Sequence, residues 1–408
     1  MKCRHCGAPL EHSFIDLGFA PPSNAYLRAE DLSRPEVHYP LRVKVCDRCW
    51  LVQTEDYASS EELFSADYAY FSATSTSWLD HAARYSAMIT DRLGLGPESL
   101  VIEVAANDGY LLRNFVAAGI PCLGIEPTAS TAASAEALGI PMLQEFFGED
   151  LGRQLATAGR QADLIAGNNV YAHVPDINDF TLGLAAALKP EGTITLEFPH
   201  LLQLIKRTQF DTVYHEHFSY LSLTAVANVF TAAGLRIWDV EQLSTHGGSL
   251  RIYGCHINAA IETTERVDLL LDQEDQFGLT QLKAYTNFQT RIDRVKNDFV
   301  AFLIKQKRAG RKVAAYGAAA KGNSLLNYAG VRPDLLPFVC DAASSKQGLF
   351  MPGSHIPIRS PRALREAPLP DFVVILPWNI AAEIRSQLRD LSDQGVQFIT
   401  AVPELRIL

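Results

Sequence analysis

The chain has 408 residues, of which 48% are hydrophobic and 20% charged, and its formal net charge is −10. This length and composition predict a globular protein of two or three domains. The acidic balance, without a basic stripe, argues against nucleic acid as a partner. No long apolar run and no secretory leader are present in the sequence, so we expect a cytoplasmic protein without a membrane partner.

Two CxxC pairs stand near the start of the chain, within CRHCGAP and CDRCWLV. Their four thiolates, from Cys3, Cys6, Cys46 and Cys49, can close a tetrahedral structural zinc site. A redox role would need a βαβ context, which the surrounding sequence lacks. Because sulfur would fill all four positions, we expect the zinc to stabilise a small domain and to take no part in the chemistry.

The next region alternates strands and helices. A helical stretch at 78–93 precedes four apolar segments, which we interpret as strands: SLVIEV, PCLGIEPT, ADLIAGNN and GTITLEFPH. Strands that alternate with helices predict a parallel, doubly wound α/β sheet. Ligands of such sheets bind beyond the carboxyl ends of the strands.

Polar residues follow the expected strands at these carboxyl ends. They are Glu103, Asn107, Asp108, Gly109, Glu126, Asn168, Asn169, His173 and Glu197. Glu126 stands where an acid can accept hydrogen bonds from two ribose hydroxyls. The turn AANDG lacks the glycines of a pyrophosphate cradle. S-adenosylmethionine, which has a ribose but no pyrophosphate, therefore fits better than a dinucleotide, with its amino-acid tail near Gly109.

A long helical connector at 280–310 leads to a second α/β unit. Its expected strands lie in RKVAAYGAAAKG, PFVCDAASS and DFVVILPWN. Lys321, in the turn YGAAAKG, lies near an expected helix N-terminus, which can bind an anion. Equally, Gly317 and the alanines of this turn can serve only the close packing of a helix on a strand.

Residues 214–220 read YHEHFSY, in a chain with only 11 histidines. Such density indicates a proton-transfer site or a metal site, and the metal site would use His215 and His217 with a third donor. Burial with satisfied hydrogen bonds explains any one of these residues, but less well a cluster that follows the fourth strand. His246, in STHGGSL, can join the site, although a lone histidine in a glycine-rich turn is more often structural.

The order of these motifs resembles that of the three-domain sugar C-methyltransferases, which use S-adenosylmethionine to methylate a carbon of nucleotide-linked 4-keto-deoxysugars. Beside the two CxxC pairs, the motifs are EVAANDGYLL, GIEP, NNVYAHV, YHEHFSYLS, YGAAAKGNSLLNY and KQGLFMPGSHIPI, and they span nearly the whole chain. The resemblance implies a zinc-binding domain at 1–65, a class I Rossmann-like methyltransferase core at 66–265 and a C-terminal Rossmann-like α/β domain at 266–408. The last domain would contribute to nucleotide-sugar binding.

The resemblance also implies the roles of individual residues. His217 would be the base, and the other catalytic residues would be Glu216, Tyr214, His173 and Tyr68, with Tyr70 as the alternative to Tyr68. S-adenosylmethionine would be bound by Glu103, Asn107, Asp108, Gly109, Glu126 and Asn168. The diphosphate of the sugar would be held by Lys321, Asn323 and Lys346.

This chemistry requires such residues. Removing a proton beside a ketone gives an enolate, and a neutral histidine is suited to remove it at pH 7. Glu216 can fix the imidazole tautomer, and a tyrosine hydroxyl or a second histidine can stabilise the enolate oxygen. The resemblance, with which this chemistry agrees, implies a C-methyltransferase that acts at C-3 of a sugar, with a dTDP-linked sugar as the partner.

Other functions remain open from the sequence. Transfer to oxygen or nitrogen of a sugar or a small natural product needs little more than a base, and a chain of this kind can also bind S-adenosylmethionine without catalysis. An NAD-linked oxidoreductase or epimerase would need GxGxxG, which neither AANDG nor YGAAAKG supplies. The sequence leaves open whether C-3 or C-5 receives the methyl group, and it leaves open the oligomeric state.

Overall fold

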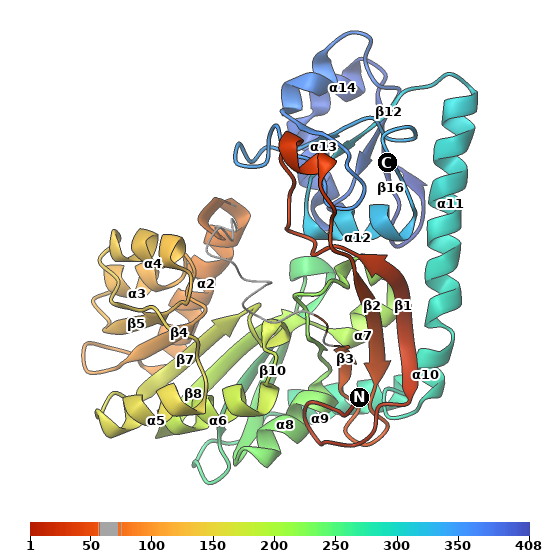
Figure 1. Cartoon of the computed structure of the whole chain (residues 1–408). Coiled ribbons are helices and arrows are strands. Elements are labelled where there is room, and N and C mark those ends of the chain that lie inside the picture. Colours follow the sequence, from red (N-terminus) through yellow and green to blue (C-terminus); the bar gives the residue numbers. More distant parts are fainter. Residues whose placement is uncertain (56, 58–71, 75) are drawn as a thin grey trace.

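The computed structural model describes residues 1–55, 57, 72–74 and 76–408. Three sheets organise this part of the chain, with four, seven and six strands. Figure 1 shows the seven-stranded core sheet at the lower left, the four-stranded N-terminal sheet at the lower right and the C-terminal sheet above it. None of the helices in the described residues combines the length and apolar character that a membrane span requires.

The core sheet has the strand order β10-β11-β8-β7-β4-β5-β6. Neighbouring strands run parallel, except that β11 is antiparallel to both β10 and β8. The strands are β4 (Val101–Val104), β5 (Cys122–Ile125), β6 (Met142–Leu143), β7 (Ala162–Asn168), β8 (Leu188–Pro199), β10 (Leu235–Leu243) and β11 (Ser249–His256). The four predicted strands are β4, β5, β7 and β8, so the predicted parallel sheet is confirmed.

Helices cover both faces of the core sheet (Figure 1). Successive strand residues point to opposite faces, so Val101 and Ile102 belong to two different apolar clusters. The helices packed with Val101 are α2 (Thr76–Leu93), α3 (Leu112–Ala117) and α4 (Ala129–Glu136). Those packed with Ile102 are α5 (Glu149–Thr157), α6 (Ile177–Ala187), α8 (Leu223–Ala232) and α9 (Glu265–Phe277). The predicted helix at 78–93 is confirmed as α2.

The N-terminal sheet is antiparallel and takes its last strand from the middle of the chain. Its order is β1 (His12–Ala20), β2 (Tyr39–Val45), β3 (Val52–Thr54) and β9 (Ser219–Tyr220). Its apolar side chains pack on the core helix α7 (Leu201–Lys206). Because β9 ends the YHEHFSY motif, this sheet includes part of the motif itself.

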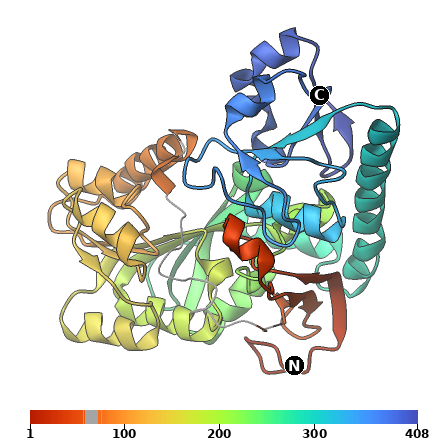
Figure 2. The ribbon, with the colours of Figure 1, turned by 45° about the horizontal axis from the view of Figure 1, so that its top comes forward.

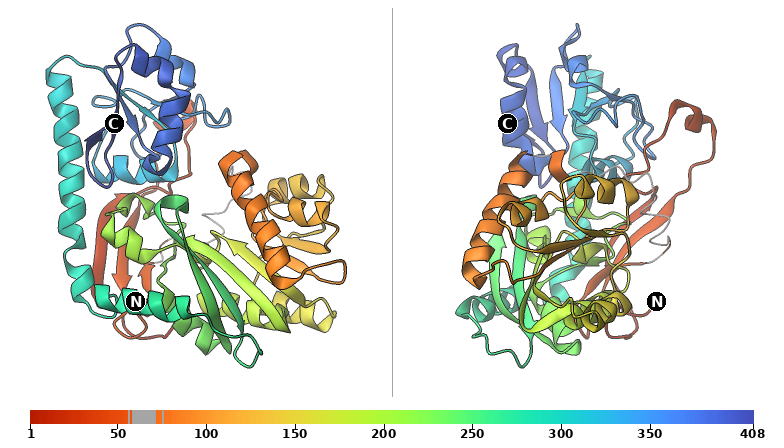
Figure 3. Two further views of the ribbon diagram at one scale, coloured as in Figure 1. Left: turned by 180° about the vertical axis from the view of Figure 1, so that it is seen from behind. Right: turned by 90° about the vertical axis from the view of Figure 1, so that its left-hand side faces the viewer.

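The C-terminal sheet has the order β14-β13-β12-β15-β16-β17, and only β17 is antiparallel to its neighbour. Its strands are β12 (Val313–Tyr316), β13 (Val339–Cys340), β14 (Ile358–Arg359), β15 (Phe372–Ile375), β16 (Gln397–Thr400) and β17 (Arg406–Ile407), and its helices are α12 (Ala320–Tyr328), α13 (Ala381–Gln387) and α14 (Arg389–Asp393). The predicted helical connector is confirmed as α10 (Lys283–Thr286) and α11 (Phe288–Arg308), which runs along the N-terminal and C-terminal sheets (Figure 3).

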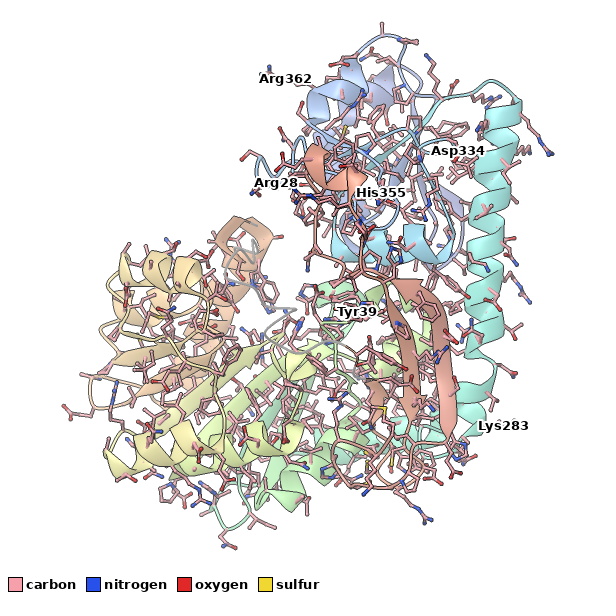
Figure 4. All side chains as sticks on the ribbon, viewed as in Figure 1. Arg28, Tyr39, Lys283, Asp334, His355 and Arg362 are labelled. Carbon is pink, nitrogen blue, oxygen red and sulfur yellow. The ribbon has the colours of Figure 1, made fainter. Side chains whose placement is uncertain are left out.

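Residues 21–38, between β1 and β2, form an arm that crosses to the C-terminal sheet (Figure 2). Leu27 forms a β-bridge with Phe350. The Glu36 carboxylate accepts a hydrogen bond from the Gly353 N–H at 2.8 Å and lies 2.9 Å from His355 Nε2. Figure 4 shows His355 near the short helix of this arm and Tyr39 at the start of β2. The N-terminal region therefore contacts both of the other sheets.

Candidate active site

The carboxylate of Glu126 lies against the turn that follows β4. Its Oε2 accepts a hydrogen bond from the Asn107 N–H at 3.1 Å, and its Oε1 accepts one from the Thr128 N–H at 2.9 Å. Each carboxylate oxygen keeps a further lone pair after these bonds. The acid is therefore placed beside the AANDG turn and can still accept hydrogen bonds from a ribose.

The AANDG turn has a left-handed backbone at three positions. The φ angles of Ala105, Asn107 and Gly109 are 58°, 50° and 77°, a conformation that is strained for residues other than glycine. A Cβ at Gly109 would also collide with the end of the Ile140 side chain and lie 3.1 Å from the Ala135 Cβ. The sequence predicts that a cofactor tail approaches Gly109, and the structure adds a second reason for glycine, the close packing of α4.

The side chains of Asn107 and Asp108 hold the backbone that leads into α2. Asn107 Oδ1 accepts a hydrogen bond from the Ser72 N–H at 3.0 Å, and Asp108 Oδ2 accepts one from the Ala73 N–H at 2.9 Å. Asp108 Oδ1 is buried without a hydrogen-bond partner among the described residues. This oxygen can therefore accept a hydrogen bond from a ligand.

The other two predicted cofactor residues lie around Tyr110. Asn168 Nδ2 donates to the Tyr110 hydroxyl oxygen at 3.3 Å. Burial raises the pKa of Glu103 well above its ordinary value, and the Tyr110 hydroxyl offsets this effect only in part. Glu103 is thus a fully buried carboxyl beneath the cofactor edge of the sheet.

His217 is held so that one ring nitrogen is left to accept a proton. Its Nδ1 lies 2.9 Å from the Thr212 carbonyl oxygen. Since a carbonyl can only accept, Nδ1 donates the hydrogen bond and Nε2 carries the lone pair. Burial, and then the charge of His173, hold the pKa of His217 well below its ordinary value. The imidazole is therefore neutral at pH 7.

Two other predicted catalytic residues surround His217. The ring centroids of His173 and Tyr214 lie 4.5 Å and 4.0 Å from that of His217. His173 ends a short helix just beyond β7, at the edge where Asn168 lies, and burial lowers its pKa to about 4. The cluster therefore adjoins the cofactor edge of the sheet. The fifth predicted catalytic residue, Tyr68, and its alternative Tyr70 lie outside the described residues.

Glu216 does not make the contact expected of it. Its Oε1 accepts a hydrogen bond from Asn24 Nδ2 at 3.2 Å, and burial raises its pKa to about 7. The backbone carbonyl of Thr212, rather than this carboxyl, accepts from His217 Nδ1. The tautomer of His217 is therefore set by the main chain.

The metal interpretation of YHEHFSY finds no support in the described residues. His215 Nε2 lies 3.3 Å from the Tyr39 carbonyl oxygen, and His217 Nδ1 faces Thr212. Among the described histidine, cysteine and acidic residues, the four cysteines are the only group of three or more with metal-ligand spacing. YHEHFSY is therefore better explained as a proton-transfer cluster.

Lys321 extends from the start of α12 toward the core. Its Nζ donates to Asn379 Oδ1 at 3.3 Å and lies 4.9 Å from the centre of the Trp378 ring. Trp378 Nε1 in turn donates to Asp211 Oδ2 at 2.7 Å, just before Thr212 in the chain. After burial and His173, the positive charge of Lys321 further lowers the pKa of His217. Lys321 is therefore electrostatically coupled to His217.

The remaining predicted diphosphate ligands are placed differently. Asn323 is 1% exposed, and its Oδ1 accepts a hydrogen bond from Asn327 Nδ2 at 3.1 Å. Lys346 Nζ donates to the Ala318 carbonyl oxygen at 2.9 Å and lies 5.2 Å from the centre of the Tyr26 ring. The Lys346 ammonium group thus contacts the YGAAAKG turn, whereas the Asn323 Oδ1 is bound to Asn327 within α12.

A buried network around Glu197 was not predicted. Glu197 Oε2 accepts a hydrogen bond from Arg251 Nη2 at 2.8 Å and lies 2.8 Å from His81 Nε2, while Oε1 accepts one from the Thr245 hydroxyl at 2.8 Å. The sequence signals were an acid at a strand end and a polar, glycine-rich turn. The network connects that turn, α2 and β8.

His246 follows Thr245 in this turn and has a φ of 52°. Its Nε2 lies 3.1 Å from Asn169 Nδ2, and its ring centroid lies 5.3 Å from that of Trp78. Burial lowers its pKa to about 4, and the charge of Lys321 contributes. The structure thus adds His246 to the cofactor edge, beside the predicted Asn169.

The four cysteines converge as predicted. Their sulfur atoms lie within 4.8 Å of one another, with Cys3–Cys49 and Cys6–Cys46 distances of 3.5 Å. A tetrahedron with Zn–S bonds of about 2.3 Å separates its sulfurs by about 3.8 Å. The spacing and the all-sulfur donor set fit a structural zinc site.

Family models match three consecutive parts of the chain. Residues 3–64 match "Putative zinc binding domain", residues 78–240 match "Methyltransferase domain", and residues 244–403 match "C-methyltransferase C-terminal domain". C-methyltransferase NovU from Streptomyces niveus is 33% identical over 407 residues, which cover 100% of this chain and 96% of that protein.

Two solved structures resemble part of the chain. Magnesium protoporphyrin IX methyltransferase (ChlM) from Synechocystis PCC 6803 with bound SAH is 15% identical, with a TM-score of 0.35 over 44% of this chain and 83% of that chain. An S-adenosylmethionine-dependent methyltransferase from Clostridium acetobutylicum ATCC 824 is 9% identical, with a TM-score of 0.35 over 44% and 92%. Both similarities are low, so the fold assignment depends on the strand order and the family models.

The core sheet, its carboxyl-edge acid and the methyltransferase domain model define a class I, S-adenosylmethionine-dependent methyltransferase. The C-terminal domain model and the full-length similarity to NovU narrow this class. The chain belongs to the C-methyltransferase family and carries a structural zinc site.

Proposed function

We propose that this enzyme methylates C-3 of a nucleotide-linked 4-keto-deoxysugar, with a dTDP-linked sugar as its substrate. The state of His217 is the main support. Its neutral ring donates from Nδ1 to the Thr212 carbonyl and leaves Nε2 to accept a proton, 4.5 Å between ring centroids from His173 at the cofactor edge. Methyl transfer to carbon needs a base that forms a carbon nucleophile. Oxygen and nitrogen already have a lone pair, so methyl transfer to them does not need a base of this kind.

In the proposed reaction, His217 Nε2 removes a proton from the carbon beside the ketone. The electron pair of that C–H bond moves toward the ketone oxygen, which becomes an enolate. The Nδ1–H of the resulting imidazolium keeps its bond to the Thr212 carbonyl. S-adenosylmethionine supplies an electrophilic methyl group when bound. The enolate carbon forms the new bond to that methyl carbon as the bond between methyl carbon and sulfonium sulfur breaks, so the ketone re-forms and S-adenosylhomocysteine is the leaving group.

Charge on the enolate oxygen must be stabilised for this proton to leave. Lys321 is the described cation that is coupled to His217, and Tyr214 lies against the same ring. One preorganised donor or cation at a developing oxyanion lowers the activation free energy by about 3–4 kcal/mol. We therefore assign Lys321 to the ketone oxygen in preference to the diphosphate, with Tyr214 as a second donor.

The remaining groups receive supporting roles in this proposal. Glu126 and the AANDG turn bind the ribose and the methionine tail, with Glu103 and Asn168 beneath them, and Tyr68 completes the catalytic set. Lys346 contacts the diphosphate from the C-terminal domain. We place this domain at 266–408, after a zinc-binding domain at 1–65 and a core at 66–265.

Free thiols favour a reducing compartment, so we propose that the enzyme acts in the cytoplasm.

Proton exchange without the methyl donor tests this function. The enzyme is incubated in deuterated water with S-adenosylhomocysteine and a panel of dTDP- and GDP-linked 4-keto-6-deoxysugars, and the ring protons are followed by NMR. We expect exchange at one carbon beside the ketone, slowed about 10²- to 10⁴-fold by His217→Ala because a general base is lost. His12→Ala, in β1, is the matched control and should exchange normally.

The site of exchange also distinguishes the alternatives. Exchange at C-3 supports the proposal, whereas exchange at C-5 moves the methyl group to that carbon. Exchange that survives in His217→Ala assigns the base to another residue. If no sugar exchanges although S-adenosylhomocysteine binds, the enzyme methylates oxygen or nitrogen, or binds the cofactor without catalysis.

A further inference from the structure

The N-terminal region contacts every residue from His215 to Tyr220, which we call the base segment. Two of the contacts are strand pairs in the N-terminal sheet, and the others are hydrogen bonds and a ring contact. The contacting residues are Tyr39 for His215, Asn24 for Glu216, Thr54 for His217 and Phe218, Arg4 for Phe218, Gln53 for Ser219 and Val52 for Tyr220. Such complete coverage is more than a zinc domain needs for its own fold.

Thr54 makes the contact nearest to the base. Its hydroxyl lies 3.3 Å from the His217 carbonyl oxygen and 3.4 Å from that of Phe218, to either of which it can donate, and its N–H donates to the Phe218 carbonyl oxygen at 3.1 Å. The side chain of Thr54 is 3% exposed. The main chain of His217 is therefore attached to the end of β3, while its ring is attached to the Thr212 carbonyl.

The zinc site lies next to this contact. Gln53 Nε2 donates to Cys3 Sγ at 3.2 Å, and Gln53 Oε1 accepts from the Arg4 N–H at 2.8 Å. Arg4 Nη2 then donates to the Thr54 carbonyl oxygen at 3.0 Å. Gln53 is fully buried. The end of β3 is thus held by the same residues that surround the cysteines.

The arm supplies a second attachment. Asn24 Nδ2 donates to Glu216 Oε1 at 3.2 Å, and the neighbouring Tyr26 hydroxyl donates to the Ala318 carbonyl oxygen at 2.6 Å. Ala318 belongs to the turn that also carries Lys321. The arm therefore connects the base segment with the turn that carries Lys321.

A general base works only when it is held close to the position from which it can reach its proton. Displacement by about 1 Å can cost 10²-fold in rate, and side chains are held in place by the contacts that surround them. The Thr212 carbonyl fixes the tautomer of His217, but this bond alone leaves the main chain free to shift. The bonds from Thr54 and Asn24 restrict that shift.

We propose that the N-terminal region is a positioning element for proton abstraction, in which Thr54 and Asn24 hold the base segment and the four-cysteine site holds Thr54. Thr54 and Asn24 are positioning residues, because they act through His217 and Glu216. This inference rests on the proposed role of His217 as the base. It assigns the zinc-binding domain a part in catalysis that the sequence analysis did not expect.

The test compares Thr54→Val, which removes the hydroxyl at nearly constant shape, with Thr54→Ser, which keeps it. Thr54→Val should slow deuterium exchange about tenfold, and its combination with Asn24→Leu about 100-fold, while Thr54→Ser stays within twofold of wild type. The affinity for S-adenosylhomocysteine, measured by calorimetry, should change less than twofold in all variants, because the cofactor edge lies on the core sheet.

Val43→Ala is the matched structural control. Val43 is fully buried in β2 and pairs with Thr54 in the sheet register. Its truncation should lower the melting temperature of the enzyme without slowing exchange. If Thr54→Val lowers the melting temperature as Val43→Ala does and leaves exchange unchanged, the N-terminal region is only structural and the inference is wrong.

A second readout does not depend on the substrate. The imidazole N–H signal of His217, assigned by its loss in His217→Ala, reports the bond to Thr212 in ¹⁵N-histidine-labelled enzyme. In the double variant this signal should broaden or shift, whereas Val43→Ala should leave it in place. If wild-type enzyme exchanges no sugar proton, the proposed function fails, and this signal still decides whether the N-terminal region positions His217.

Discussion

The core sheet and the C-terminal sheet carry the same arrangement of turn and acid. Glu126 and Asp341 each follow the second strand of their sheet. Glu126 accepts hydrogen bonds from the Asn107 N–H at 3.1 Å and the Thr128 N–H at 2.9 Å. Asp341 accepts them from the Ala318 N–H at 2.7 Å and the Ala343 N–H at 2.8 Å. In both sheets, therefore, the carboxylate accepts a backbone hydrogen bond from the turn that follows the first strand and so stabilises this turn.

The two turns differ in what covers them. The core turn contacts the residues just before α2, through hydrogen bonds from Ser72 and Ala73. The C-terminal turn is contacted by Tyr26 of the N-terminal arm, whose hydroxyl donates to the Ala318 carbonyl oxygen. The contacts of the core turn thus come from residues 35 positions away in sequence, whereas the C-terminal turn is contacted both by Lys346 and by a region nearly 300 residues away. This difference predicts that changes in the core turn affect cofactor binding, whereas changes in the C-terminal turn affect substrate binding.

The largest effect should come from the glycine of the C-terminal turn. Gly317 has a φ of 94°, and a Cβ there would collide with the ring of Pro377. Gly317→Ala should therefore lower the free energy of unfolding by about 3 kcal/mol, from backbone strain and overpacking. Gly109→Ala, in the core turn, should cost about 2 kcal/mol, because the Ile140 side chain can rotate away.

Denaturant unfolding measures both variants, with Gly330→Ala as the control. Gly330 has a φ of 64° with nothing within 4 Å of a Cβ, so its change isolates the backbone strain, about 1 kcal/mol. Equal decreases in the free energy of unfolding for Gly317→Ala and Gly330→Ala would show that the contact with Pro377 does not destabilise the protein.

Removal of the core acid should have the next largest effect. Glu126→Ala removes a carboxylate that can accept charge-assisted hydrogen bonds from a ribose, each worth about 1.5–3 kcal/mol. We expect the Kd of S-adenosylhomocysteine to rise about 100-fold, measured by isothermal calorimetry. Asp341→Ala is the matched change in the other sheet and should leave this Kd within twofold. A rise in both variants would mean that the two turns are not independent.

Asp341→Ala should instead weaken the binding of the proposed sugar nucleotide. Without this carboxylate the Ala318 N–H loses its acceptor, and the turn that carries Lys321 and lies under Lys346 relaxes. We expect the KM of the sugar nucleotide to rise about tenfold, as one lost hydrogen bond to a charged group would produce. Steady-state kinetics at saturating S-adenosylmethionine measure this, and an unchanged KM would exclude the turn from substrate binding.

The core turn was predictable from sequence because its parts are close in the chain. An apolar strand, AANDG and a second strand ending in Glu126 form a short-range pattern, and the strand order follows from the rules for alternating strands and helices. The four cysteines were predictable because ligand chemistry restricts both residue type and spacing.

The support of the base was not predictable in the same way. Thr212 acts through its carbonyl group, which every residue has, so no side chain marks it. Thr54 and Asn24 are common residue types. The contact of Thr54 depends on the pairing of β3 with β9, a strand of two residues, and that of Asn24 depends on the path of the arm. The sequence therefore predicts Glu216 for the task that the Thr212 carbonyl performs, and it leaves the role of His246 open.

The smallest expected effect is a shift in pH dependence, and it tests whether the two sheets act on one another. Burial, His173 and Lys321 all lower the pKa of His217, with His246 a weaker contribution. Protonated His217 cannot accept a proton, so exchange falls as the pH decreases through this pKa. The acid limb of wild-type exchange should therefore lie below about 6.5, the ordinary histidine value.

Lys321→Gln removes one of these positive charges and makes the protonated imidazole less unfavourable. The pKa of His217 then rises, and the acid limb should move to higher pH by less than about one unit. Lys305→Gln, on the exposed side of α11, changes the net charge equally and should leave the limb in place. A limb that does not move in Lys321→Gln would mean that the lysine acts on the diphosphate, and the cation at the enolate oxygen would have to be sought elsewhere.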